Sequence, residues 1–432
     1  MFFVWARRVF RFALGCAIWL GCLPAFASER PAPAGAPVAR DITARCIVTP
    51  SYNQDQAPAM LTEDLATFWE APMDTHDGER PYVQVDTPPD EPAYGLYIVW
   101  AYTPGDWQVL VPNPEWERYA HMGDDDPLSR PRWVAAGSGG AHGFVHEYLP
   151  LDGLTSLRIQ PRRMREHPFS IAALHVLGEG ETPDWVQLWQ PIPPLVDLMV
   201  ISAHPDDELI YFGGTLPTYA GDRGLDTAVV YMTYSTRSRR SELLNGLWAA
   251  GVRSYPVLGD FLDGFTASAE QAAAICGDEQ VSAFITEQLR RYKPKVVVSH
   301  DLNGEYGHGM HRLTAQKTLE AVADLVWDEG CFPESAAAYG VCDVEKLYLH
   351  LYPEETVIMD WRAPLEAFGG RTAVDVACQA FGQHASQQAY RVALEDDPHS
   401  CFLFGLAFTL VGPDEEGGDF FEHVTLWREE EE

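Results

Sequence analysis

The spacing of hydrophobic and polar positions divides this chain into two regions with different periods. Between about residues 41 and 178, short apolar runs are separated by proline, glycine and aspartate turns and show little helical period. Short runs at this spacing are typical of β-sandwiches. The strands are predicted at residues 82–85, 95–102, 107–111, 143–149, 157–160 and 171–177. The pattern therefore predicts an all-β, jelly-roll-like sandwich over residues 41–180.

From residue 195 onward, apolar runs of strand length alternate with segments of helix length. Strands are predicted at residues 198–202, 227–233, 254–258 and 295–299, and helices at 209–220, 238–250, 281–291 and 311–323. Alternating β and α segments indicate a parallel sheet that is covered by helices. The prediction is an α/β domain over residues 195–428 with a Rossmann-like, mostly parallel sheet and flanking helices. Residues 187–194 form the predicted hinge.

Ionisable side chains follow two of the predicted strands directly. The stretch from Ala203 to Glu208 (Ala-His-Pro-Asp-Asp-Glu) follows the strand at 198–202, and His308 and His311 follow the strand at 295–299. In such sheets ligands bind beyond the carboxyl ends of the strands, so the two segments can meet. Imidazole and carboxylate groups suit Zn²⁺, and a catalytic zinc takes three protein ligands and keeps one position for water. The sequence therefore predicts a divided zinc site with a catalytic carboxylate beside it.

The same residues carry a family resemblance. The strand that ends in Ala-His-Pro-Asp-Asp-Glu, the Arg-x-x-Glu of Arg239 and Glu242, and the Gly-Glu-Tyr-Gly-His-x-x-His of residues 304–311 resemble the LmbE/PIG-L family of zinc-dependent N-acetylglucosaminyl deacetylases. The resemblance covers about residues 195–388, and residues 383–387 are similar to the distal His-x-Ser-Gln of the family. Either zinc-region motif alone is less specific than the two in combination.

The resemblance implies a division of tasks at this site. His204, Asp207 and His311 would hold one zinc ion per chain, and Asp206 would be the general base. A metal lowers the pKa of its bound water towards about 7, and a carboxylate within hydrogen-bond reach can take the remaining proton. Iron is an open alternative to zinc, because imidazole and carboxylate ligands accept several divalent ions.

Three further residues complete the predicted site. His308 lies three positions before His311 and is the candidate acid, either protonating the leaving amine or stabilising the tetrahedral oxyanion. The resemblance suggests that Tyr306 assists at the oxyanion. Arg239 either binds substrate hydroxyls or pairs with Glu242 along its helix, and the sequence leaves both open.

The β-rich region carries a weaker resemblance. The order of its landmarks, from Trp69 through residues 82–86 to residues 157–159 and 170–176, is similar to discoidin-like, galactose-binding sandwiches, which often hold glycans. This similarity implies a carbohydrate-binding domain. Its tryptophans either stack on sugars or pack in the core, since large aromatic rings dominate core burial. These tryptophans are Trp69, Trp100, Trp107, Trp116 and Trp133.

The N-terminus and the charge indicate where the protein works and what it binds. Arginines 7, 8 and 11 precede an apolar stretch that ends at Ala25-Phe26-Ala27, which predicts a signal peptide over residues 1–27, followed by a proline-rich linker over 28–40. A secreted or periplasmic location follows from this prediction. Acidic residues outnumber basic ones 63 to 30, for a net charge of −33, which disfavours nucleic acid as a partner. No later segment is long and apolar enough to span a membrane.

These observations predict an exported zinc hydrolase that removes the acetyl group from an N-acetylglucosamine unit of a glycan or glycoconjugate, giving acetate and a free amine. A second hypothesis keeps the zinc hydrolase but changes the substrate to another N-acyl amino sugar, an antibiotic or a lipid-linked glycan. A third is a carbohydrate-binding protein without catalysis. The complete set of site residues favours an enzyme over that third hypothesis.

Overall fold

Two antiparallel sheets form the β-rich region of the computed structural model, which describes residues 37–62, 64–73, 79–119, 121–122, 131–163, 168–328 and 330–430. The predicted signal peptide and residues 28–36 of the predicted linker lie outside the described residues. The strands of this region are β1 (Ile47–Pro50), β2 (Trp69–Glu70), β3 (Val83–Asp86), β4 (Ala93–Trp100), β5 (Trp107–Pro112), β6 (Trp133–Gly139), β7 (His146–Leu154), β8 (Ser156–Pro161) and β9 (Ser170–Leu177).

Alternation of side chains explains how these two sheets make a core. One sheet has the order β1-β3-β8-β5-β6 and the other has the order β2-β9-β4-β7. Val83 and Val85 of β3 are buried while the residues after each of them are partly exposed, as the two-residue period of a strand requires. Trp69, Trp100 and Trp107 are also buried in this core. Three of the five tryptophans therefore pack inside and offer no face to a sugar.

A seven-stranded mixed sheet forms the centre of the α/β region. Its order is β12-β11-β10-β13-β14-β18-β15, and the strands from β12 to β14 pair in parallel, whereas β18 pairs antiparallel with both of its neighbours. The strands are β10 (Leu198–Ser202), β11 (Thr227–Tyr231), β12 (Val257–Leu258), β13 (Val296–Ser299), β14 (Lys346–His350), β15 (Thr356–Ile358) and β18 (Leu403–Thr409), with β16 (Pro364–Leu365) and β17 (Arg371–Thr372) in a small separate ladder.

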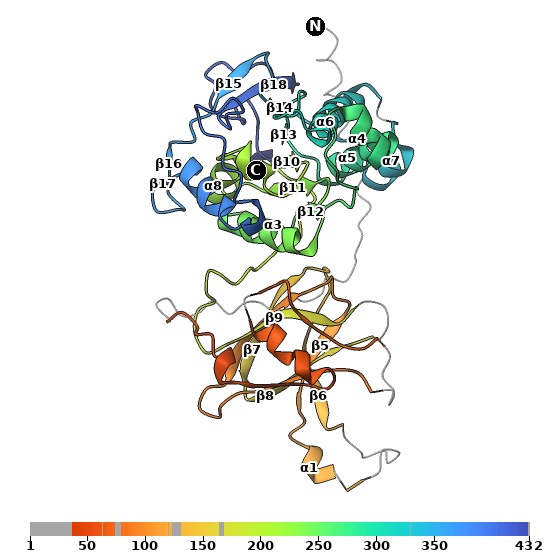
Figure 1. Ribbon diagram of the computed structural model, residues 1–432, viewed down its shortest axis with the longest axis vertical. Coiled ribbons are helices and arrows are strands. Elements are labelled where there is room, and N and C mark those ends of the chain that lie inside the picture. The colour runs from red at the N-terminus through yellow and green to blue at the C-terminus, as the bar shows by residue number, and fades with distance from the viewer. Residues whose placement is uncertain are drawn as a thin grey trace. The chain divides into compact units, whose positions relative to one another are not determined.

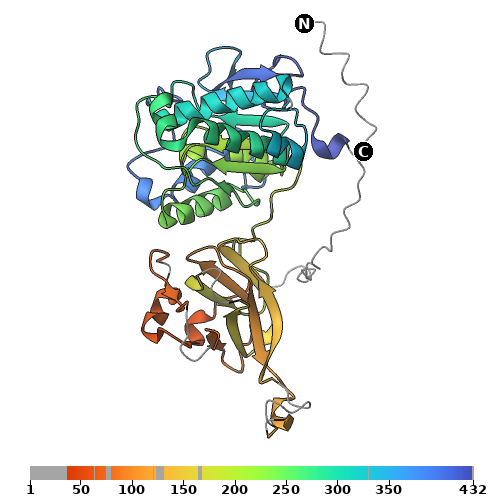
Figure 2. The ribbon, with the colours of Figure 1, turned by 90° about the vertical axis from the view of Figure 1, so that its right-hand side faces the viewer.

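Helices cover both faces of this sheet (Figures 1 and 2). Val200 of β10 packs in one hydrophobic cluster with residues of α3 and α8, and the adjacent Ile201 packs in a second cluster with residues of α4, α5 and α6. The helices are α2 (Asp207–Ile210), α3 (Arg237–Ala249), α4 (Ala269–Cys276), α5 (Asp278–Tyr292), α6 (Gly309–Trp327), α7 (Pro333–Tyr339), α8 (Ala373–Phe381) and α9 (Trp427–Glu430), with α1 (Trp116–Tyr119) in the β-rich region. In the part of the chain that the structure describes, none of the helices could cross a membrane.

The helix predicted at residues 209–220 is wrong as a single element. Helix α2 ends at Ile210, and a π-helical segment follows at Pro217–Asp222. Gly213 lies between them with φ of 51°, and a Cβ at this position would lie 2.6 Å from the Cys401 sulfur. The positive φ interrupts a regular helix, and the close approach of Cys401 leaves room for glycine alone at this position.

In its coarse form the predicted fold is confirmed, because a β-rich region precedes a mixed α/β region. The Rossmann-like and jelly-roll descriptions, and the domain bounds at 41–180 and 195–428, stay predictions.

Candidate functional site

The site lies at the carboxyl ends of β10 and β13. Strand β10 pairs with β11 on one side and with β13 on the other. From β10 the chain first adds β11 and β12 on one side of the sheet and then adds β13 and β14 on the opposite side, so β10 lies at a topological switch point. Ligands of open α/β sheets bind in the crevice at such a point. A cleft of about 150 Å³ is found there, lined among others by His204, Asp206, Tyr306 and His308.

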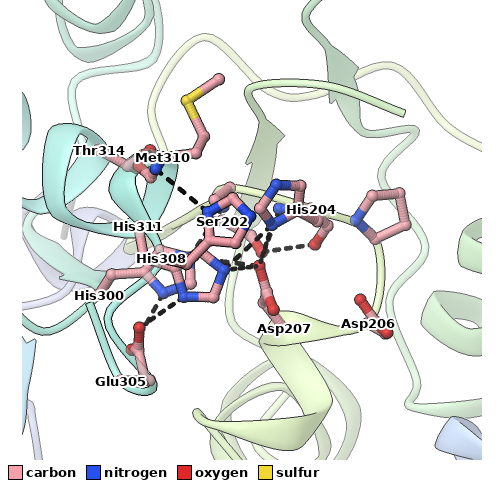
Figure 3. Close-up of polar contacts among 12 residues, drawn as sticks. Ser202, His204, Asp206, Asp207, His300, Glu305, His308, Met310, His311 and Thr314 are labelled. Carbon is pink, nitrogen blue, oxygen red and sulfur yellow. Dashed lines mark hydrogen bonds and ion pairs between the residues drawn. The ribbon is translucent and has the colours of Figure 1, made fainter. Parts of the chain in front are cut away.

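Three possible ligand atoms from two segments of the chain converge beside this cleft (Figure 3). His204 Nδ1 lies 3.0 Å from Asp207 Oδ2 and 3.1 Å from His311 Nε2, and Asp207 Oδ2 lies 3.2 Å from His311 Nε2. Ligands that hold Zn²⁺ at about 2.0–2.1 Å in tetrahedral geometry are about 3.3 Å apart. These atoms of the three residues predicted to hold the metal are thus spaced as a zinc site needs.

Carboxylates on the far side of each imidazole fix the orientation of the rings. Asp263 Oδ1 lies 3.1 Å from His204 Nε2, and Glu305 Oε2 lies 2.6 Å from His311 Nδ1. When the ring is neutral and this carboxylate accepts its proton, the lone pair of the other nitrogen is directed at the shared point. Metal-binding histidines characteristically have such partners.

The charges at this point favour a cation. Burial lowers the pKa of His311, but the carboxylates of Asp207 and Glu305 outweigh burial and raise it to about 10. For His204 as well, burial would lower the pKa, but the carboxylates of Asp207 and Asp263 have the larger effect and raise the pKa to about 9. Without a metal, protons on the two rings therefore balance the buried carboxylates. A divalent cation would supply the same positive charge, so the donor set fits one.

Two neighbouring histidines could also offer ligand atoms. His308 can join His204 and His311 in one group, and His300 can join Asp207 and His311 in another. However, His300 Nε2 accepts the Ala203 N–H at 2.8 Å, and its Nδ1 lies 3.0 Å from Glu305 Oε1. Both nitrogens of His300 are therefore engaged by protein groups, so this residue supports the loop.

Asp206 is held in an unusual backbone conformation. Its φ is 106°, which few residues other than glycine adopt, and its N–H donates to Glu208 Oε2 at 2.9 Å. Strain of this kind persists where the surrounding structure enforces it, and it is concentrated at functional sites. Burial and the adjacent Asp207 raise the pKa of the Asp206 carboxyl to about 7, while Arg239 opposes the rise.

Arg239 contacts Asp206 and does not pair with Glu242. Its Nη2 donates to Asp206 Oδ1 at 3.0 Å and to the Pro205 carbonyl, whereas both carboxylate oxygens of Glu242 accept hydrogen bonds from Ser386. The alternative of a pair along the helix is therefore wrong. Arg239 also lines the cleft.

His308 and Tyr306 complete the wall of the cleft. His308 is the N-cap of α6, and its Nδ1 accepts the Met310 N–H at 3.2 Å. A neutral ring in this position carries its proton on Nε2. Burial, together with the charges of His204 and His311, lowers the pKa of His308 to about 4. Between the two predicted tasks, hydrogen-bond donation to an oxyanion suits a neutral ring better. The ring of Tyr306 lies 5.6 Å from that of His308, and burial raises the pKa of its hydroxyl.

Sequence reasoning missed three residues of the site. Asp263 follows β12. Because ligands of such sheets bind beyond the carboxyl ends of the strands, the search that examined the ends of β10 and β13 could have found Asp263 at the end of β12. Glu305 lies within the motif of residues 304–311 and contacts three imidazoles, those of His300, His311 and His350. His350 ends β14, a strand that the sequence analysis did not identify.

Comparison with known proteins identifies relatives of the α/β region. Residues 199–322 match the PIG-L family model, described as GlcNAc-PI de-N-acetylase. The 1D-myo-inositol 2-acetamido-2-deoxy-alpha-D-glucopyranoside deacetylase 1 of Catenulispora acidiphila is 28% identical over 210 residues, which are 41% of this chain and 64% of that protein. The deacetylase of the same substrate name from Nocardia farcinica is 33% identical over 188 residues, 35% of this chain and 60% of that protein. The chain thus spans less than two thirds of these curated relatives.

Solved structures resemble each region only distantly. N,N'-diacetylchitobiose deacetylase from Pyrococcus horikoshii is 22% identical, covers 46% of this chain and 73% of its own, and has a TM-score of 0.35. The family 32 CBM from C. perfringens NanJ, solved with galactose, is 11% identical. The match covers 32% of this chain and 98% of that chain, with a TM-score of 0.24. Both scores lie below 0.5, so neither likeness says anything about activity here. The LmbE/PIG-L resemblance is supported by the family model and the curated relatives, while the discoidin-like resemblance stays a prediction.

Proposed function

We propose that this chain is an exported, metal-dependent deacetylase that hydrolyses the N-acetyl group of an N-acetylglucosamine-containing glycan or glycoconjugate. PIG-L family deacetylases are hydrolases of N-acetyl amide bonds, and the matched relatives are named as deacetylases of an acetamido sugar. The matched residues 199–322 include each residue given a role in this proposal, from His204 to His311.

One observation carries the proposal. His204 Nδ1, Asp207 Oδ2 and His311 Nε2 lie within 3.2 Å of one another, and the strained, buried carboxyl of Asp206 is adjacent in the chain. A structural ion-pair cluster has no need for two ring lone pairs directed at one point. Metal-assisted hydrolysis requires that arrangement together with a nearby proton acceptor.

His204, Asp207 and His311 would hold one Zn²⁺, with iron as the alternative, and the ion would supply Lewis-acid chemistry at the acetamide carbonyl. Asp206 takes the proton of the attacking water as the new C–O bond forms, for which a raised pKa is suited, and gives that proton to the amine nitrogen as the C–N bond breaks. His308 Nε2–H donates to the oxyanion that develops on the carbonyl oxygen, with Tyr306 beside it. Arg239 holds the carboxylate of Asp206 and contacts substrate hydroxyls at the rim of the cleft.

Export narrows the substrate in this proposal. A signal peptide over residues 1–27 would deliver the enzyme to the periplasm or the outside, where cell-wall and extracellular glycans occur. Amino-terminal sequencing of protein recovered from the exported fraction tests this step. The expected first residue is Ser28, and an intact Met1 on cytoplasmic protein would contradict export.

Metal analysis together with acetate release tests the site. Purified protein should contain about one zinc per chain, and His204→Ala should lose both the zinc and the acetate release. Folded protein without any bound metal, and active without it, would overturn the proposal.

A substrate panel tests the chemistry. The panel contains free N-acetylglucosamine, its soluble oligomers, a polymer and glycoconjugates, and acetate is the measured product. Zinc-loaded protein that is inert on all of them but releases another acyl group would favour the other-amide hypothesis. Zinc-loaded protein that binds the polymer without hydrolysis would favour the non-catalytic hypothesis.

A further inference from the structure

Helix α3 presents two different stripes of side chains. Arg237, Arg240, Asn245 and Trp248 contact residues before the α/β sheet in the chain, whereas Arg239, Glu242 and Gly246 face the site and the segment after α8. Residues three and four apart share one side of a helix, which is why the two stripes stay separate. The helix therefore lies between the β-rich region and the site.

The first turn of α3 is bound by a loop of the β-rich region. Arg237 donates to the Leu65 carbonyl at 3.2 Å and to the Ala66 carbonyl at 2.6 Å. Its guanidinium carbon also lies 4.4 Å from the centre of the Phe68 ring. Two carbonyl acceptors and an aromatic face hold one guanidinium in a defined place, as its planar fork allows.

A second arginine, three residues later, is bound by the sheet itself. Arg240 is buried, and its Nη2 donates to the Ala101 carbonyl at 2.8 Å. Ala101 follows β4 and is only 1% exposed, and its own N–H donates to the Ser170 carbonyl of β9. The hydrogen bond to β9 therefore fixes the position of the Ala101 carbonyl, which accepts from Arg240. A hydrogen bond of a charged donor to a buried carbonyl is among the stronger kinds.

The rest of the helix is bound on the same side. Gln187 Nε2 donates to Asn245 Oδ1 at 2.6 Å, and Trp248 Nε1 donates to the Asp184 carbonyl at 2.8 Å. The Trp248 ring also meets that of Trp189 at 5.4 Å. Helix α3 is thus anchored along its length, from its first turn to its last.

The opposite stripe touches the catalytic groups. Arg239 lies between the two anchored arginines and donates to Asp206 and to the Pro205 carbonyl. A Cβ at Gly246 would lie 2.7 Å from His384 Nε2, so the helix backbone fits closely against that side as well. A small rotation of α3 would move Arg239 relative to Asp206.

We propose that the β-rich region positions the active site through α3, and that Arg237 and Arg240 are positioning residues for Arg239. The inference rests on the proposed deacetylase function and deepens it. The β-rich region then acts in catalysis on small soluble substrates as well, whether or not it also holds a glycan. Displacements of about 1 Å from a distant change can cost a hundredfold in rate.

A double-mutant cycle tests the proposal with the full chain. The variants are Arg240→Ala, Arg239→Ala and the two together, and the substrate is the smallest soluble acetamido sugar that the wild type hydrolyses. Arg240→Ala should lower kcat/KM about tenfold or more, chiefly through kcat, at unchanged zinc content. In the Arg239→Ala background the same change should cost less than about twofold, because the group that it positions is gone. A merely structural role predicts equal factors in both backgrounds.

Two further variants keep the test decisive. Phe68→Ala weakens the anchor from the β-rich side without altering α3 and replaces Arg240→Ala if that protein does not fold. Arg253→Ala is the matched control, because Arg253 lies beyond the last turn of α3, where its side chain contacts the Trp248 ring and donates to the Trp248 and Val252 carbonyls. This variant should leave kcat/KM within about twofold. Equal activity of the wild type, Phe68→Ala and Arg240→Ala would overturn the inference alone. An inactive wild type would instead overturn the proposed function.

Discussion

Both regions of this protein enclose carboxylates, but the two regions satisfy them differently. In the β-rich region, Glu147 Oε2 accepts the indole N–H groups of Trp100 and Trp107 at 2.7 and 2.6 Å, and Oε1 accepts the Gly140 N–H at 2.6 Å. Every donor is a neutral group with a fixed direction, and both oxygens are used. Nothing is left to bind a ligand, so this arrangement is structural.

In the α/β region the carboxylates of Asp207 and Glu305 are surrounded by imidazoles. The hydrogen bonds of Asp263 and Glu305 use one nitrogen of His204 and one of His311, and the other nitrogens meet at Asp207. The backbone is strained here as well, with φ of 106° at Asp206 and 38° at Glu305. A site that leaves donor atoms directed at a common point, and holds strained backbone to do so, is built for a ligand.

The largest predicted effect concerns Asp206. Changing Asp206 to Asn keeps the shape and tolerates the positive φ, since asparagine adopts that region more readily than most residues. The proton acceptor is lost, so kcat for acetate release should fall by about 10²–10⁴-fold. Zinc content and the melting temperature should not fall. Full activity of the Asp206→Asn variant would show that Asp206 is structural, like Glu147.

Asp263 gives the next largest effect. Changing it to Ala removes the partner of His204 Nε2 and should weaken zinc binding by about 10–100-fold. Competition with a chelator measures this affinity directly. Asp260 lies in the same loop, is exposed and provides the matched control as Asp260→Ala. Equal zinc affinity in both variants would remove Asp263 from the site.

The sequence predicted the parts of the molecule that follow from local rules. Strand β10 was predicted with its observed bounds, and α3 within one residue, because apolar runs of strand length and the helix-length segments between them are local features of the sequence. The convergence of His204, Asp207 and His311 was also predictable, since parallel strands end at one edge. The motifs identified the candidate ligands, and the predicted parallel sheet indicated that they would lie close together.

The contacts that the sequence could not predict depend on packing between distant segments. Arg239 has a pairing candidate in Glu242 one turn away, but the observed partner Asp206 lies 33 positions earlier. His350 was not predicted as a site residue, because the strand that it ends, β14, was not predicted either. The contact of Arg240 with Ala101 joins the two regions and leaves no periodic signal in either.

The next prediction concerns the contribution of the Glu147 carboxylate to the stability of the β-rich region. Changing Glu147 to Gln would keep the size but direct an NH₂ group at N–H donors, whichever way the amide turns. Leaving at least one buried donor unsatisfied should lower the free energy of unfolding by about 2–3 kcal/mol, measured by urea denaturation. Activity per folded molecule on a soluble substrate should be unchanged. Glu179 is exposed, and Glu179→Gln should leave stability within about 0.5 kcal/mol of the wild type.

The smallest effect concerns the pH dependence of the β-rich region. His146 is buried and its Nδ1 lies 2.6 Å from the Tyr97 hydroxyl, and burial, helped by the charge of Arg240, lowers the pKa of His146 to about 3. In the unfolded chain this histidine binds a proton near pH 6.5. Between about pH 6.5 and pH 3 the unfolded state therefore holds more protons than the folded state, and stability falls as the pH falls. Going from pH 7 to pH 5 should cost about 2 kcal/mol through this residue alone.

His146→Gln retains an acceptor for Tyr97 and removes the titrating group, so its stability should depend less steeply on pH over that interval. Urea denaturation of both proteins at pH 7 and pH 5 measures the difference. The same slope in both proteins would contradict this role of His146. The carboxylates of Asp207, Glu305 and Asp263 cannot account for such a slope, because their pKa values are lowered and the stability that they contribute is lost only below about pH 5. A shallower slope in His146→Gln would assign acid sensitivity over this interval to the buried histidine of the β-rich region.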